Sequence, residues 1–102
     1  MGINVHWQDE GGGQLAAVDD DRSTFSHIIQ RLRDDRSVCL RFIDPWGDTT
    51  FNQLQIPVLI EELECASAET NAREEREQIA LILHLAHRSV GVTHTYLRFI
   101  GD

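Results

Sequence analysis

Apolar and polar residues alternate at the start of the chain, as they do in a strand with one buried face. In residues 2–8 the apolar side of this pattern consists of Ile3, Val5 and Trp7. Residues 9–13 are two acidic residues and three glycines, which favour a turn because glycine adopts positive φ without steric cost. We therefore predict a hairpin in which residues 14–18 form the second strand.

The apolar spacing becomes helical after residue 23, with apolar residues three or four apart at Phe25, Ile28, Ile29 and Leu32. Ser23 or Thr24 is suited to cap such a helix, and the aspartates at 19–21 suit the positive end of its dipole. We predict a helix from Thr24 to about Asp34.

Residues 37–43 are rich in apolar and β-forming side chains and predict a third strand. In that strand Val38, Leu40 and Phe42 would share one face. Residues 44–48 contain Pro and Gly at positions that favour a tight turn. Residues 49–53 then either return as a short fourth strand, which we favour, or lead directly into the next helix.

Pro57 marks the first turn of the next predicted helix, where the missing N–H of proline costs nothing. An alternative start uses Asn52 as cap with Gln55 three residues on. That start would place Pro57 inside the helix, at a cost of about 3 kcal/mol.

Residues 66–71 contain no Gly or Pro, so a single helix over 57–89 is an open alternative. A charged segment after Thr70 favours a second N-terminus, and we prefer a helical hairpin whose second helix covers 71–88. Gly91 suits the position just beyond its end.

The last predicted strand covers residues 93–100, and its tetrad Leu-Arg-Phe-Ile also occurs at 40–43. The predicted order is β-β-α-β-(β)-α-α-β. This order indicates a single α+β domain over 1–102, with a mixed or antiparallel sheet of four to five strands. About three helices are expected on one face of the sheet.

The charge of the chain limits the classes of partner. The formal net charge is −8, and all nine basic residues are Arg. We expect no binding to nucleic acid or to an anionic membrane, since both require a basic surface. No signal-like segment precedes the first strand, no apolar run approaches the ~20 residues of a membrane span, and the two cysteines form no dense framework. We therefore expect a cytoplasmic protein.

Three histidines close to one another in sequence form a candidate metal site. His84 and His87 lie three apart on a predicted helix, and His94 follows soon after it. Zinc favours imidazole nitrogen, although no metal-binding motif accompanies these residues. Partly buried histidines near a helix C-terminus are the structural alternative.

The second candidate is the turn that contains Asp44, Trp46 and Asp48. Loops carry binding residues disproportionately, and Trp is enriched in interface hot spots. The structural alternative, which we favour, is that Asp44 caps the turn and Trp46 folds onto the core.

Arg41 and Arg98 are the third candidate. If their strands are neighbours, the two side chains form an anion site or pair with Glu61 or Glu62. Otherwise they lie on a solvated sheet face.

The sequence contains no P-loop, no dinucleotide-binding glycine motif and no nucleophile elbow. We therefore expect a non-catalytic protein-interaction domain without a cofactor. One specific form is an acidic inhibitor or immunity-type protein with a basic partner. The alternatives are a metal-dependent enzyme built on the histidines and a self-associating structural protein, which would be a homodimer.

Overall fold

The computed structural model describes residues 2–32 and 36–101. It has an α+β fold with one four-stranded sheet and three α-helices. The elements in chain order are β1 (Asn4–Asp9), β2 (Gln14–Val18), α1 (Thr24–Arg31), the 3₁₀ helix η1 (Leu40–Phe42), β3 (Asp48–Phe51), α2 (Ile56–Glu69), α3 (Arg73–Ser89) and β4 (Thr95–Ile100).

The sheet has the strand order β2-β1-β4-β3, and every neighbouring pair is antiparallel. Alternation in β1 and β4 buries Val5, Trp7, Leu97 and Phe99 on one face. The other face carries the half-buried His6, which lies opposite Ala17 on one side and Arg98 on the other. The expected hairpin at the N-terminus and the strand at the C-terminus are confirmed.

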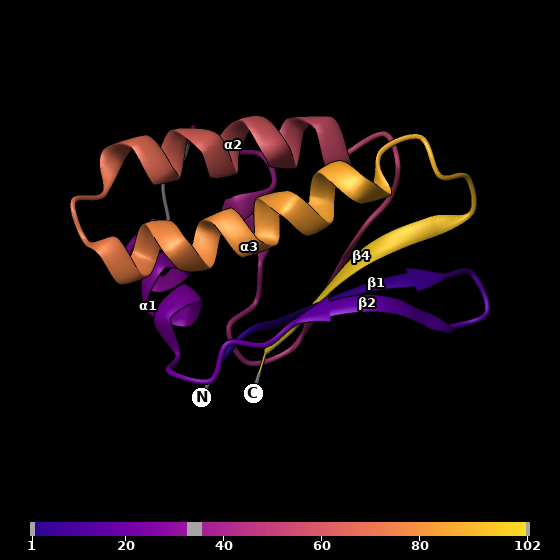
Figure 1. Cartoon of the computed structure of the whole chain (residues 1–102), viewed down its shortest axis with the longest axis horizontal. Helices are drawn as coiled ribbons and strands as arrows, with labels where there is room; N and C mark the ends of the chain where they lie inside the picture. The colour runs from indigo at the N-terminus through magenta and orange to yellow at the C-terminus, as the bar shows by residue number, and fades with distance from the viewer. Residues whose placement is uncertain (1, 33–35, 102) are drawn as a thin grey trace.

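The helices cover the apolar face of the sheet. Figure 1 shows α2 and α3 side by side, with α1 near the N-terminal half of α3. The core between these layers includes an aromatic cluster, in which the Phe99 ring lies 5.9 Å from that of Phe25 and 5.6 Å from that of Phe51. The uncovered face of the sheet remains open to solvent.

Asp20, and not the predicted Ser23 or Thr24, caps the start of α1. Its buried carboxylate accepts hydrogen bonds from the backbone N–H groups of Phe25 and Ser26 and from that of Ile3 at the start of the sheet. Ser23 has a left-handed backbone and makes no capping bond with its side chain. A single carboxylate therefore ties the first helix to the first strand. The predicted end of this helix near Asp34 falls outside the described residues.

The strand predicted over residues 37–43 is wrong, because this segment forms a loop around η1. The Glu62 carboxylate on α2 accepts hydrogen bonds from the backbone N–H groups of residues 38, 39 and 40, at 2.7, 3.0 and 2.9 Å. These donors are satisfied by a side chain, so they need no neighbouring strand. The apolar side chains that are buried are those of Cys39, Leu40 and Ile43, a spacing that does not fit a strand face.

The returning strand expected near 49–53 is confirmed as β3, which ends at Phe51. Pro57 lies in the first turn of α2, as predicted. Asn52 and Gln55 also form the reciprocal bonds of a cap, since each side chain accepts a hydrogen bond from the other residue's backbone N–H. They precede the helix, so the cap and Pro57 are compatible.

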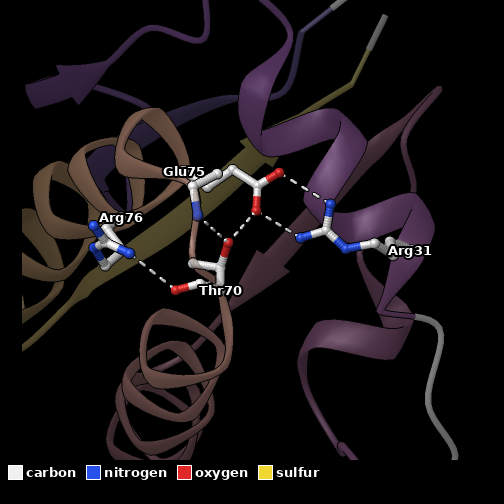
Figure 2. A network of polar contacts seen from close by, with 5 residues as sticks. Arg31, Thr70, Glu75 and Arg76 are labelled. Atoms are coloured by element: carbon white, nitrogen blue, oxygen red, sulfur yellow. Dashed lines mark hydrogen bonds and ion pairs between the residues drawn. The ribbon is translucent and has the colours of Figure 1, made fainter.

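Residues 57–89 form two helices because the chain becomes extended at Thr70. Figure 2 shows the polar network that holds this junction: Arg31 on α1 donates two hydrogen bonds to the Glu75 carboxylate, at 2.6 and 3.0 Å. The Thr70 hydroxyl donates a third, and Arg76 donates to the Thr70 carbonyl oxygen. Arg31, and then Thr70, lowers the pKa of Glu75 to about 2.

Neither α2, α3 nor the shorter α1 is both long and apolar enough to cross a membrane, in the part of the chain that the structure describes.

Candidate interaction surface

The most exposed aromatic side chains belong to the loop between α1 and β3. We call residues 38–48 the aromatic loop. Phe42 is 61% exposed and Trp46 is 66% exposed, and Val38 is also mainly exposed. Neither ring is buried in the core, so both are accessible at the surface of the described residues.

The backbone of the aromatic loop is held at several points. Asp44 closes the turn, because its carboxylate accepts a hydrogen bond from the Trp46 backbone N–H at 2.9 Å. The Thr49 hydroxyl accepts from the Asp44 N–H and donates to the Phe42 carbonyl oxygen. At the first end of the loop, Glu62 fixes residues 38–40.

Gly101 brings the C-terminal segment against this turn. Its backbone N–H donates to the Gly47 carbonyl oxygen at 2.7 Å. A Cβ atom at position 101 would lie 2.4 Å from the backbone of Pro45, which is buried here. The close approach requires glycine. The C-terminal segment therefore packs against the turn at Pro45 and Gly47, while the Trp46 side chain is exposed to solvent.

Arg41 and Arg98 are not neighbours on adjacent strands, since Arg41 belongs to η1. The Arg41 guanidinium lies 4.7 Å from the centre of the Phe42 ring. Arg98 forms an ion pair with Asp48 across the β3–β4 ladder. Four of the five predicted contact residues, Arg41, Asp44, Trp46 and Asp48, lie in the aromatic loop. The fifth, Arg98, lies on β4 and pairs with Asp48.

The three candidate histidines have different surroundings. His84 is exposed on α3. His87 Nε2 lies 4.0 Å from a Glu64 carboxylate oxygen, whereas His94 Nδ1 lies 3.2 Å from one of Glu10. Among residues 2–32 and 36–101, no three His, Cys, Asp or Glu side chains are grouped so that they could hold a metal ion.

The two thiols differ in exposure: Cys65 is exposed and Cys39 is buried. Burial, and then the nearby charge of Glu62, raises the pKa of Cys39 to about 11. That thiol is therefore protonated near neutral pH and is a poor nucleophile. The exposed Cys65, and not Cys39, lines a hollow of about 370 Å³ between α2 and residues 36–40, and Glu62 is also part of its wall.

The sequence pattern did not single out two residues that shape the aromatic loop. Phe42 was placed with Val38 and Leu40 on one face of a predicted strand, and Glu62 was considered only as a partner for the candidate arginines. No local signal identifies either residue, because the backbone of residues 38–40 is held by Glu62, which lies 22 to 24 residues away in the chain.

No family model matches the chain, and neither the curated proteins nor the solved structures contain a match.

Proposed function

We propose that this protein is a non-catalytic protein-interaction domain that contacts its partner through the aromatic loop. The observation that carries the proposal is the exposure of Phe42 and Trp46 on a backbone held at both ends. A rigid loop loses little conformational entropy on binding, and burial of two aromatic rings supplies a large apolar contribution.

A more specific form of the proposal is an acidic inhibitor or immunity-type protein that covers a basic surface. The net charge of −8 supports it, since opposite charge accelerates encounter with a basic partner. The aromatic side chains would then anchor the complex, while the charge mainly determines how fast it forms.

Crosslinking is the first step of the test, because the partner must be identified before its affinity is measured. A photo-reactive phenylalanine analogue replaces Phe42 in one sample and Leu54 in another. Leu54 is the matched control, since it is 87% exposed and lies outside the aromatic loop. A protein that crosslinks to the analogue at position 42, and does not crosslink to the analogue at position 54, is then purified for binding measurements.

Titration with that partner then tests the loop directly. We expect Trp46→Ala to weaken binding at least ~30-fold, in the range of a hot-spot residue, and Leu54→Ala to leave it unchanged. Trp46 fluorescence should shift to shorter wavelength on binding, because its ring leaves water. Equal affinity for the Trp46→Ala and wild-type proteins would refute the proposed role of the loop.

A salt series separates the acidic-inhibitor form from the general proposal. For a basic partner, the association rate should fall steeply as salt rises through the range where the Debye length shrinks from ~30 to ~8 Å. A salt-independent rate together with a strong Trp46→Ala effect would retain the interaction domain and reject the basic partner.

A further inference from the structure

Strand β2 is an edge strand with one side unpaired. It lies at the end of the order β2-β1-β4-β3, and within the described residues β1 is its only partner strand. Figure 1 shows β2 at the outer margin of the sheet. Alternate residues of an antiparallel edge strand direct both their N–H and C=O groups away from the sheet, where they are available to another strand.

The sequence of β2 offers little protection against such pairing. Proteins commonly guard a sheet edge with charged side chains or proline. The residues of β2, Gln-Leu-Ala-Ala-Val, include neither. Ala16 and Ala17 are small, Leu15 is 48% exposed, and the irregularity in the ladder lies at the Gln14 end.

The opposite edge of the sheet is different. Strand β3 carries the charged Asp48, and the hydroxyl of its Thr49 is bonded to the backbone of residues 42 and 44. The Thr49 side chain therefore ties β3 to residues 42 and 44 of the aromatic loop. The two edges of the sheet differ in charge: of the two described edge strands, β2 carries no charged residue, although its ladder with β1 is irregular between Gln14 and Ala16.

The charges around β2 select the chemistry of its partner. The turn before it contains Asp9, whose carboxylate accepts hydrogen bonds from backbone N–H groups of that turn, and Glu10, which lies 3.2 Å from His94 Nδ1. The segment after it contains the exposed Asp19 and Asp21, followed by Arg22. A partner strand that pairs along β2 would therefore face the uncharged residues of β2 at its centre and carboxylates of this chain near both of its ends. Basic residues at the ends of that strand are favoured.

A second copy of this chain fits the edge less well. In a two-fold antiparallel pair of β2 strands, the flank at 9–10 of one copy would meet the flank at 19–21 of the other. Both flanks are acidic, and like charges placed close together oppose pairing.

We propose that β2 binds an extended segment of a partner protein, with an uncharged β-forming centre and Arg or Lys at its ends, as a fifth strand of the sheet. Main-chain hydrogen bonds supply affinity in this mode of recognition, and the flanking carboxylates supply selectivity. The site lies at the opposite edge of the sheet from the aromatic loop, so it does not depend on the proposed use of that loop.

The probe is a synthetic blocked peptide, Arg-Arg-Thr-Val-Thr-Val-Arg-Arg. One control peptide carries N-methyl groups on alternate central residues, which removes ladder donors and keeps the charge. Another replaces every Arg by Glu. Binding to the isotope-labelled full chain is followed by amide chemical shifts and amide hydrogen exchange.

Two variants test the edge in the protein. Ala17→Lys places a charge on β2, while Ala68→Lys places the same charge on an exposed alanine of α2. We expect Ala17→Lys to weaken binding of the Arg peptide at least ~10-fold and Ala68→Lys to change it less than ~2-fold. Circular dichroism checks that both variants fold.

The expected result is binding of the Arg peptide with slowed exchange of amides in residues 14–18, and at least ~10-fold weaker binding of both control peptides. Equal binding of the N-methylated peptide would overturn strand addition, because charge alone would then explain the affinity. Absence of binding at about 1 mM Arg peptide would also overturn it. If the free chain dimerises through protected β2 amides, the occupant is a second copy and the proposed partner is wrong.

Discussion

The tetrad Leu-Arg-Phe-Ile occurs at residues 40–43 and 97–100, and the chain folds it in two ways. In η1 and the residue after it, Leu40 and Ile43 are buried, three positions apart. In β4, Leu97 and Phe99 are buried, two positions apart. These are the periods of a 3₁₀ helix and a strand.

The partners of the backbone account for the difference. Residues 97–100 lie between β1 and β3, which supply hydrogen bonds along both sides of the strand. The segment leading into 40–43 receives its acceptors from Glu62, 22 to 24 residues away. The same local preference for extended structure is therefore satisfied in one place and overridden in the other.

The largest expected difference in unfolding free energy is between substitutions of Phe99 in β4 and of Phe42 in η1. Phe99 is fully buried against two other rings, so Phe99→Ala should lower the free energy of unfolding by about 4 kcal/mol. Phe42 is 61% exposed, so Phe42→Ala should cost less than about 1 kcal/mol. Urea denaturation measures both, and Phe99→Leu provides a milder variant if the alanine protein does not fold. Equal losses at the two positions would show that Phe42 is buried in solution.

Removal of the Glu62 carboxylate should release the backbone of residues 38–40, which it holds by three hydrogen bonds. Glu62→Gln replaces a carboxylate that accepts three N–H groups by an amide with one acceptor oxygen, which should cost about 2 kcal/mol. Glu61→Gln is the control, because its side chain is exposed on the same helix, and it should stay within about 0.5 kcal/mol.

The Cys39 thiol can report the same change locally. In a Cys65→Ser background, Glu62→Gln should speed the reaction of Cys39 with a thiol reagent, because the segment opens and the thiol pKa falls. Amide exchange at residues 97–100 should change only as much as global stability does. Unchanged thiol reactivity would mean that core packing alone, without Glu62, holds residues 38–40 in place.

The third prediction uses acid. Arg31 is the last residue of α1. Its partner Glu75 has a pKa of about 2 in place of the ordinary value near 4.5. A lowered pKa adds stability that is complete above pH 4.5 and is lost as pH falls towards 2. The wild type should therefore lose more stability over this interval than Glu75→Gln, and amides of residues 38–42 should lose protection before those of 97–100.

Arg73→Gln serves as the control for the acid experiment, since its contact with Glu77 is exposed and 3.6 Å long. Its pH dependence should follow that of the wild type. Parallel curves for the wild type and Glu75→Gln would contradict a role for Glu75 in acid unfolding.

The parts of the fold that sequence predicts are those in which local pattern and tertiary partners agree. β1 and β4 alternate in the sequence and lie at the centre of the sheet, and Pro57 lies in the first turn of α2 because it cannot donate a backbone hydrogen bond. Residues 37–43 have the same local pattern as a strand, but their acceptors come from Glu62. No reading of the segment itself contains that information.

The candidate surface shows the same division. The turn closed by Asp44 was predicted from the local chemistry of residues 44–48, whereas the favoured packing of Trp46 onto the core was wrong, since its side chain is 66% exposed. The exposure of Phe42 was missed, because it follows from the conformation of the preceding segment. The suggested pairing of Arg41 with Arg98 failed for the same reason, since it assumed that both tetrads are strands.

The smallest expected effects concern the two arginines. Arg98 pairs with Asp48 while both are partly exposed, and such pairs contribute about 0.5 kcal/mol. The Arg41 guanidinium over the Phe42 ring contributes a similar ~0.5 kcal/mol. Double-mutant cycles with alanine at each pair separate the two, because screening by salt should weaken the Arg98–Asp48 coupling much more than the Arg41–Phe42 coupling. If both couplings fall equally with salt, Arg41 acts through a charged partner and the ring contact contributes nothing measurable. A salt-resistant Arg41–Phe42 coupling would instead mean that the contact of the guanidinium with the ring itself holds Phe42 in place.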